Sequence, residues 1–322
     1  MLQIYGINDT AFETVALELW RYQYECNPLY KSFCSALGIL PANVLTLGHI
    51  PFLPITMFRD HEVKTGDWNP MTIFRSSGTT GSIPSSHAIR DLTLYHFIAE
   101  QCFSAFYESP DQFTWLALLP SYIERPDSSL VDMVQYFMQQ STAKENGFYS
   151  KPDEKLVKQL EQLYQTKRPT ILIGVSFALL DLLEQYKIPV WDELLVIETG
   201  GMKGRREELT RNELHERFRN HHPDLRIASE YGMTELMSQA YSEQHVFTAG
   251  PTMKVLIRDI SDPLKIVDPG QRGIINVIDL GNIDTCAFIA TDDVGIINDN
   301  GSFEVLGRVD SSDIRGCNLM YS

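Results

Sequence analysis

Apolar runs alternate with amphipathic stretches through the middle of the chain. Four runs are short, almost continuously apolar and closed by turn residues, as buried strands are: residues 112–120, 169–176, 193–201 and 225–232. Between them, apolar positions recur every three or four residues, as in helices with one buried face: residues 129–140, 151–165, 177–186 and 206–222. Because strands joined through helices usually pair in parallel, the pattern predicts an α/β fold with a mostly parallel sheet over roughly residues 110–240.

The two ends of the chain differ from the middle. Before it we expect four elements: a helix over residues 11–37, β-rich pieces at 71–77 and 86–91, and a helix over 91–108 with Asp91 as N-cap. After about Val246 the chain breaks into short β-rich pieces separated by Asp, Pro, Gly and Asn. These patterns predict one domain over residues 1–322, with an α/β core over 1–245 and a small antiparallel or barrel-like β-rich subdomain over 246–322.

Composition narrows the class of protein. The 27 Lys and Arg residues against 42 Asp and Glu residues give a formal charge of −15, which disfavours non-specific binding to nucleic acid or to an anionic membrane surface. The longest uncharged stretch, between Lys31 and Arg59, contains three prolines, so we expect no membrane span. Five cysteines without a CxxC pair and an N-terminus without a signal peptide predict a cytoplasmic protein with neither disulfides nor a zinc site.

Three segments carry residues suited to binding a nucleotide. The first is a loop whose N–H and O–H groups can donate to phosphate oxygens: Ser76, Ser77, Gly78, Thr79, Thr80 and Gly81. The second is YGMTE at residues 231–235, directly after a predicted parallel strand, with an aromatic ring that can stack on a base and a carboxylate that can bind a cation. The third contains Asp293, in a predicted turn, and Arg308, fifteen residues further along the chain. Taken singly, each segment is also typical of an ordinary turn.

The order of these segments is more specific than any one of them. A TSGTTG-like loop followed by YGxTE, a TGD-like turn and GRxD resembles the AMP-forming adenylate superfamily of acyl- and aryl-CoA ligases. Within it, the chain is similar to the branch that holds the phenylacetate-CoA ligases and the acyl-protein synthetases of bacterial fatty-acid reductase complexes. The segments that resemble the acyl-protein synthetases in particular are FLPITMF, LALLPSYIERPDSSL, ILIGVSF and ETGGMKGR. The resemblance implies an adenylate-forming α/β fold, ATP and Mg²⁺ as cofactors, a carboxylic acid as substrate, and an acyl-reductase or acyltransferase as partner.

The resemblance also implies a role for each matching residue. The residues of the first loop, Ser76 to Gly81, would bind the phosphates of ATP. The adenine and the α-phosphate would be held by four residues of the later motifs: Gly200, Gly201, Tyr231 and Thr234. Glu235, in the same motif as Gly232, would coordinate Mg²⁺, while Asp293 and Arg308 would bind the ribose.

Three departures from the superfamily pattern bear on the reaction. The Lys that normally closes the phosphate loop is replaced by Ser85, Ser86 and His87, and we name Arg75 and Lys203 as cations that can substitute for it. Asp292 stands where the TGD pattern has Gly. About a dozen residues follow Arg308, so we expect no C-terminal lid domain, and the tail carries Cys317, which matches the acyl-accepting cysteine of acyl-protein synthetases.

The sequence therefore predicts an ATP-dependent ligase that activates a carboxylic, in the first place fatty, acid to acyl-AMP and passes the acyl group to Cys317 as a thioester. A thiolate is a strong nucleophile toward such a mixed anhydride. The four other cysteines lie in apolar surroundings, and we expect them to be buried: Cys26, Cys34, Cys102 and Cys286. Two alternatives remain open at this point: an acyl- or aryl-CoA ligase that lacks its lid, and a degenerate nucleotide- or acyl-binding protein without activity.

Overall fold

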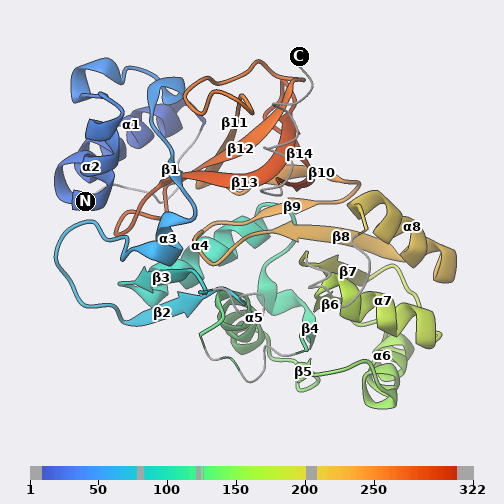
Figure 1. The fold of residues 1–322 in the computed structure, drawn as a ribbon. Helices are drawn as coiled ribbons and strands as arrows, with labels where there is room; N and C mark the ends of the chain where they lie inside the picture. Colours follow the sequence, from blue (N-terminus) through green and yellow to red (C-terminus); the bar gives the residue numbers. More distant parts are fainter. Residues whose placement is uncertain (1–8, 78–82, 121–124, 126, 201–208, 310–322) are drawn as a thin grey trace.

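The computed structural model describes residues 9–77, 83–120, 125, 127–200 and 209–309. Within them, twelve strands form one sheet in the order β11-β12-β13-β14-β10-β9-β8-β7-β6-β4-β5, with β1 paired to β13. Figure 1 shows the sheet running from the β-rich strands beside α1 and α2 to the green strands beside α5 and α6. A separate two-stranded hairpin lies near α3 and α4.

The half of the sheet that the apolar runs predicted is parallel. Its strands are β4 (Thr114–Leu118), β5 (Gly147–Tyr149), β6 (Thr170–Gly174), β7 (Leu194–Glu198) and β8 (Arg226–Tyr231). Every residue of β4, β6 and β7 is buried. This is why these strands are continuously apolar instead of alternating, since helices cover both faces of a parallel sheet.

The helices around this half carry the expected apolar stripes and caps. They are α4 (Leu92–Ser104), α5 (Ser129–Gln140), α6 (Glu154–Thr166), α7 (Ser176–Gln185) and α8 (Arg211–His221). In α6 the side chains of Leu156, Leu160 and Leu163 are buried along one face, and Asp153 accepts hydrogen bonds from the first-turn N–H groups. Asp91 caps α4 in the same way, as predicted.

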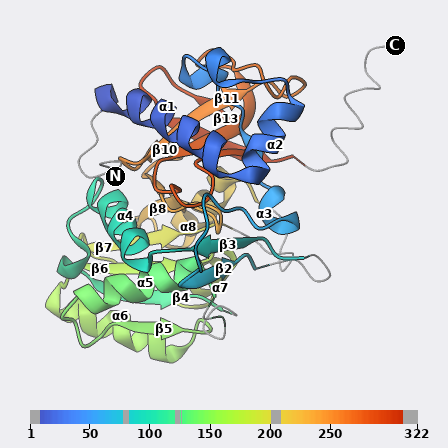
Figure 2. The ribbon, with the colours of Figure 1, turned by 90° about the vertical axis from the view of Figure 1, so that its left-hand side faces the viewer.

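The β-rich half is antiparallel. It contains β9 (Ala240–Ser242), β10 (Val246–Ala249), β11 (Met253–Arg258), β12 (Arg272–Asp279), β13 (Phe288–Ile297) and β14 (Phe303–Arg308). The short strand β1 (Leu53–Pro54) joins β13 in parallel. Figure 2 shows this half above the parallel half, with α1 beside β11 and β13.

The first predicted helix is two helices, which corrects the expectation of a single one. They are α1 (Asp9–Cys26) and α2 (Pro28–Ala36), followed by short 3₁₀ turns at Pro41–Asn43 and Leu47–His49 and by α3 (Met57–Asp60). The break lies at Asn27, whose side chain accepts a hydrogen bond from the N–H of Tyr30 while Pro28 occupies the first helical position. The hairpin consists of β2 (Thr72–Arg75) and β3 (Ser86–Ile89), and a further 3₁₀ turn spans Pro110–Gln112. Among the described residues, no helix is long and apolar enough to cross a lipid bilayer.

Candidate nucleotide site

The Gly200 turn and the YGMTE segment, both predicted to bind the nucleotide, meet at the carboxyl edge of the parallel strands. β7 ends at Glu198 and continues to Gly200, and β8, its neighbour in the sheet, ends at Tyr231 and continues into the YGMTE turn (residues 231–235). Ligands of open α/β sheets bind beyond this edge. The sheet therefore brings both segments to one place although they are about thirty residues apart in the sequence.

The third segment joins them through Tyr231. The Tyr231 hydroxyl donates a hydrogen bond of 2.8 Å to Oδ2 of Asp293, and Nε of Arg308 donates one of 3.2 Å to Oδ1 of the same carboxylate. Asp293 and Arg308 face each other across β13 and β14, and the Asp293 charge raises the pKa of Arg308. The ring of Tyr231 is 6% exposed and packs against Phe247 and Phe303, and burial raises its pKa well above the usual value. Three of the residues that the resemblance assigned to adenosine, Tyr231, Asp293 and Arg308, are thus joined by hydrogen bonds.

Thr234 and Glu235 end the YGMTE turn. The Glu235 side chain is only 5% exposed, and burial raises the pKa of its carboxyl. Among the described residues it takes part in no ion pair, and no group of three or more His, Cys, Asp and Glu residues there forms a ready metal site. A single buried carboxylate without a protein cation fits Mg²⁺, because Mg²⁺ usually binds one or two carboxylates together with phosphate oxygens. Gly232, before them, is exposed.

The base of the first loop is well defined. The N–H of Ser76 donates to the carbonyl of Ser85, and the N–H of Ser85 donates to Oγ of Ser76, which closes the hairpin below the loop. Ser77 is exposed at the start of the loop. The rest of the predicted phosphate-binding residues lie outside the described residues: Gly78, Thr79, Thr80 and Gly81.

Two cations lie beside this hairpin. Nη2 of Arg125 donates to the carbonyl of Ser76 at 3.0 Å, a contact that was not predicted because Arg125 comes from the segment after β4. Arg75, which we named as a substitute for the missing Lys, pairs with Asp127 at 3.6 Å, and Arg125 contacts the same carboxylate at 3.5 Å. Lys203, the other named cation, lies outside the described residues.

A buried carboxylate holds the turn after β7. Glu198 accepts hydrogen bonds from the N–H of Gly200 at 2.9 Å, from Ser176 Oγ at 2.8 Å and from Arg211 Nε at 2.9 Å. Burial alone would raise the pKa of Glu198, but His215 and Arg211 outweigh it and lower the pKa. Gly200 has φ +44°, in the left-handed region that glycine adopts without strain. Gly201, its predicted partner in the adenine slot, lies outside the described residues.

The cysteines divide into two groups. Cys34, Cys102 and Cys286 are buried, and burial raises the pKa of each thiol to about 12. Cys26 is exposed, which contradicts the expectation that it is buried: it is the last residue of α1, where the helix ends at the surface. Cys317, the predicted acyl acceptor, lies outside the described residues.

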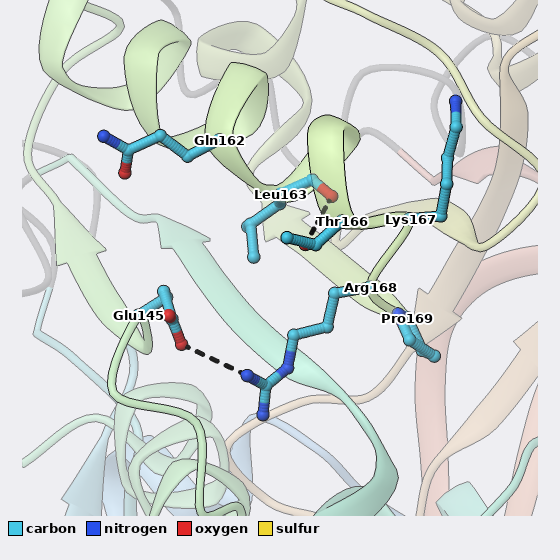
Figure 3. Close-up of a pocket in the computed structure, with 7 residues that line it drawn as sticks. All are labelled: Glu145, Gln162, Leu163, Thr166, Lys167, Arg168 and Pro169. Atoms are coloured by element: carbon cyan, nitrogen blue, oxygen red, sulfur yellow. Dashed lines mark hydrogen bonds and ion pairs between the residues drawn. The ribbon is translucent and has the colours of Figure 1, made fainter.

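A hollow elsewhere on the protein does not belong to this site. Figure 3 shows it at the amino ends of β5 and β6, where Arg168 approaches Glu145 at 3.5 Å. Its volume is about 440 Å³, and its lining residues are Glu145, Gln162, Leu163, Thr166, Lys167, Arg168 and Pro169. In a parallel sheet all amino ends lie at one edge and all carboxyl ends at the other. The hollow, at the amino ends, therefore lies at the opposite edge from Glu198 and Tyr231, which end their strands.

Comparison with known proteins agrees with the motifs. Residues 132–322, more than half of the chain, match the family described as acyl-protein synthetase, LuxE. The chain is also 25% identical over 335 residues to the long-chain-fatty-acid–luciferin-component ligase of Vibrio harveyi, which covers 94% of this chain and 85% of that protein.

Solved structures share the fold. A 2-hydroxyisobutyryl-CoA ligase in an open conformation, in complex with 2-HIB-AMP and CoA, has a TM-score of 0.67 at 12% identity over 94% of this chain and 70% of that one. The luciferase-like enzyme of the nonluminescent mealworm Zophobas morio has a TM-score of 0.52 at 18% identity over 77% of this chain, which spans 60% of that enzyme. At such identities the likeness is one of fold, and it confirms the predicted adenylate-forming α/β architecture. The chain belongs to the acyl-protein synthetase family, LuxE, as its ordered motifs predicted, and it is an AMP-forming ligase.

Proposed function

We propose that this protein uses ATP to activate a fatty acid to acyl-AMP and then transfers the acyl group to its own Cys317. The observation that carries the proposal is the meeting of Tyr231, Asp293 and Arg308 beside the turn that holds Thr234 and Glu235. This arrangement supports the proposal, because hydrogen-bonding groups that suit an adenosine lie near a buried carboxylate that suits a metal–triphosphate. The name of the family supports acyl transfer to a protein as the class of reaction. The name of the Vibrio harveyi relative, which refers to a long-chain fatty acid, supports a fatty acid as the substrate.

Each group has a role in this proposal. The turn at Gly200 and Gly201 would receive the adenine next to Tyr231, and Asp293 with Arg308 would bind the ribose hydroxyls. Phosphate oxygens would be bound by Thr234 and by the first loop: Ser76, Ser77, Gly78, Thr79, Thr80 and Gly81. Arg125 would supply a positive charge near that loop in place of the missing Lys, because it already contacts Ser76. Bound Mg²⁺, held by Glu235, would offset negative charge on the triphosphate.

The proposed reaction has two steps. A carboxylate oxygen of the acid forms a bond to the α-phosphorus of ATP, and the bond to the pyrophosphate oxygen breaks. The N–H and O–H groups of the loop stabilise the charge that develops on the leaving pyrophosphate. The Cys317 thiolate next attacks the acyl carbon, and AMP leaves as the thioester forms.

The state of the other cysteines supports Cys317 as acceptor. The thiols of Cys34, Cys102 and Cys286 are buried and have pKa values near 12, so almost none is thiolate at neutral pH. Cys26 is exposed at the end of α1, so the labelling experiment below tests it directly. Free thiols throughout the described residues also support our proposal of a cytoplasmic location.

Intact-mass measurement tests the acceptor directly. After incubation with MgATP and octanoic, dodecanoic or hexadecanoic acid, we expect the wild-type protein to gain one acyl mass that hydroxylamine removes. Cys317→Ser should still release pyrophosphate and form acyl-AMP but gain no labile acyl group, whereas the matched control Cys26→Ser should label like the wild type. Labelling of Cys317→Ser at the wild-type level would show that Cys317 is not the acceptor.

The same assay separates the rival functions. AMP release that depends on added CoA would indicate a CoA ligase, and ATP binding without acid-dependent pyrophosphate exchange would indicate an inactive binding protein. A thioester must next be reduced or transferred, so we propose a reductase or an acyltransferase as the partner that takes the acyl group. Loss of label on addition of such a protein and its reductant would support that partner.

A further inference from the structure

His87 connects the hairpin below the phosphate loop to the YGMTE turn. It is 1% exposed, and its Nδ1 lies 2.8 Å from the carbonyl oxygen of Thr234 while its Nε2 lies 3.1 Å from Oγ1 of Thr285. The Phe58 ring packs against it in a T-shaped contact, with ring centroids 5.6 Å apart. Because a carbonyl can only accept, Nδ1 carries the proton, and Nε2 of the neutral ring accepts from the Thr285 hydroxyl. Burial favours this neutral form by lowering the pKa of His87 to about 4.

Asn282 makes the corresponding contact one residue further along the turn. Its Nδ2 donates a hydrogen bond of 2.9 Å to the carbonyl oxygen of Glu235, and its side chain is 2% exposed. Two consecutive backbone carbonyls, those of Thr234 and Glu235, therefore each accept a hydrogen bond from a buried side chain. A peptide plane held at its oxygen cannot rotate freely, and rotation of these planes would redirect the Thr234 hydroxyl and the Glu235 carboxylate.

The residues that hold the turn are themselves held from the other side. Asn282 and Thr285 belong to the loop between β12 and β13 (residues 280–287). Gln23 of α1 donates to the carbonyls of Asn282 and Ile283 at 2.7 and 3.1 Å and accepts from the N–H of Ala287 at 2.9 Å. Asn27, at the break between α1 and α2, donates to the Thr285 carbonyl at 3.0 Å. Buried hydrogen bonds thus run without interruption from α1 to the YGMTE turn.

We propose that His87 and Asn282 are positioning residues for adenylation: each donates an N–H to one carbonyl of the Thr234–Glu235 pair and so fixes the direction in which these two residues meet the triphosphate. The inference rests on the proposed function. It assigns His87 a role through the protein backbone, not the phosphate contact that its place in the loop motif suggests. Since a displacement of about 1 Å can cost 10²-fold in rate, loss of either bond should lower the rate of adenylation.

Comparing the two half-reactions distinguishes a positioning role from a general loss of stability, which would lower the rates of both. Adenylation needs the triphosphate, whereas thioester formation from synthetic dodecanoyl-AMP does not. We expect His87→Leu and Asn282→Leu to lower the turnover number of ATP–pyrophosphate exchange with dodecanoic acid about tenfold or more, with a smaller change in KM for the acid. Thioester formation from dodecanoyl-AMP should fall less than adenylation, because the acyl-AMP keeps the α-phosphate that Thr234 would bind but has no pyrophosphate to be placed beside Glu235.

Two further variants serve as controls. His87→Asn keeps an N–H near the position of Nδ1, so it should retain exchange within about threefold of wild type. Thr170→Val removes a buried hydroxyl hydrogen bond at the amino end of β6, at the opposite edge of the sheet, and should leave exchange unchanged at a comparable loss in melting temperature.

The outcomes separate this inference from the function on which it rests. Exchange at the wild-type rate in both leucine variants, or an equal fall in both half-reactions that Thr170→Val reproduces, would overturn the positioning role. Absence of exchange in the wild type would overturn the proposed function and the positioning role with it. If a leucine variant does not fold, His87→Asn is compared with His87→Gln, whose N–H lies nearer the position of Nε2. If His87 is a positioning residue, only the Asn variant should retain exchange.

Discussion

Glu230 lies next to Tyr231 on β8 yet has no role in the proposed reaction. Its side chain is 8% exposed, and burial, reinforced by the charge of Glu198, raises the pKa of its carboxyl to about 8. Arg211 lowers that pKa in part. The carboxyl is thus protonated at neutral pH in the folded protein, whereas in the unfolded chain it ionises near pH 4.5.

This difference predicts how the free energy of unfolding depends on pH. Between pH 4.5 and about 8 the folded state retains a proton that the unfolded state releases, so stability falls as pH rises through that window. From pH 6 to pH 9 the loss from this one group is about 2–3 kcal/mol. Glu230→Gln keeps the shape of the side chain and cannot ionise. The free energy of unfolding of this variant minus that of the wild type should therefore increase by that amount from pH 6 to pH 9, as measured by urea unfolding at both pH values.

An exposed carboxylate provides the control. Glu243→Gln removes a surface glutamate that pairs with Arg226 and should shift stability by the same small amount at both pH values. An equal response of Glu230→Gln at pH 6 and pH 9 would show that Glu230 is ionised in the folded protein.

The residues of the site differ in how visible they are in the sequence. Tyr231, Glu235 and Asp293 belong to short motifs whose order is diagnostic, and the structure brings Tyr231 and Asp293 into contact. Asn282 belongs to no motif, and Arg125 lies in a segment that carries the resemblance but had no predicted role. Each acts on a backbone carbonyl nearly fifty residues away. Such contacts depend on which loops the sheet brings together, and local spacing carries no information about that.

Elements were predicted well where one face or both faces are buried. The continuously apolar strands β4, β6 and β7 and the striped helix α6 lie where the pattern placed them. The break between α1 and α2 was missed although Asn27-Pro28 is a capping pair. Helical spacing continues across it, and only the geometry of the cap ends the first helix.

In the β-rich half, close packing between strands makes one glycine critical. Gly295 lies on β13 at an irregularity in its pairing with β14, and a Cβ there would lie 2.5 Å from the Glu304 carbonyl oxygen and 2.7 Å from Ile275. Neither the backbone nor the buried Ile275 can move away without distorting the strands. We therefore expect Gly295→Ala to lower the free energy of unfolding by about 1–3 kcal/mol in urea titrations.

The matched substitution is Gly48→Ala. A Cβ at Gly48 would lie 3.8 Å from Ile266, an ordinary contact, so this variant should stay within about 0.5 kcal/mol of wild type. Equal stability of the two alanine variants would contradict the assigned crowding at β13.

At the scale of the whole molecule, one sheet connects the two halves. β9 pairs with β8 on one side and with β10 on the other, and β10 pairs with β14, so the backbone hydrogen bonds of the parallel half continue into the antiparallel half. Buried side chains add to this connection: Asp279 of β12 accepts from the N–H groups of Met237 and Ser238 at 2.7 and 3.0 Å. The change of texture near Val246 was visible in the sequence, but the continuity of the sheet was not, because pairing between distant strands leaves no local pattern.

Because the two halves share these backbone hydrogen bonds and the contacts of the YGMTE turn, we expect them to unfold together in one transition. Trp115 and Trp191 report on the parallel half, while Trp20 lies on α1, which bonds to the β12–β13 loop. Trp68 donates to the carbonyl of Thr65, which bonds to Thr285 of the same loop. In Trp115→Phe/Trp191→Phe and in Trp20→Phe/Trp68→Phe, the urea midpoint from fluorescence should equal the midpoint from far-ultraviolet circular dichroism of the same variant. Comparing two signals within one variant removes the effect of the substitutions on stability. Separate midpoints would mean that the hydrogen bonds across β9 and β10 are too weak to couple the halves, and the YGMTE turn would then lie on a hinge between them.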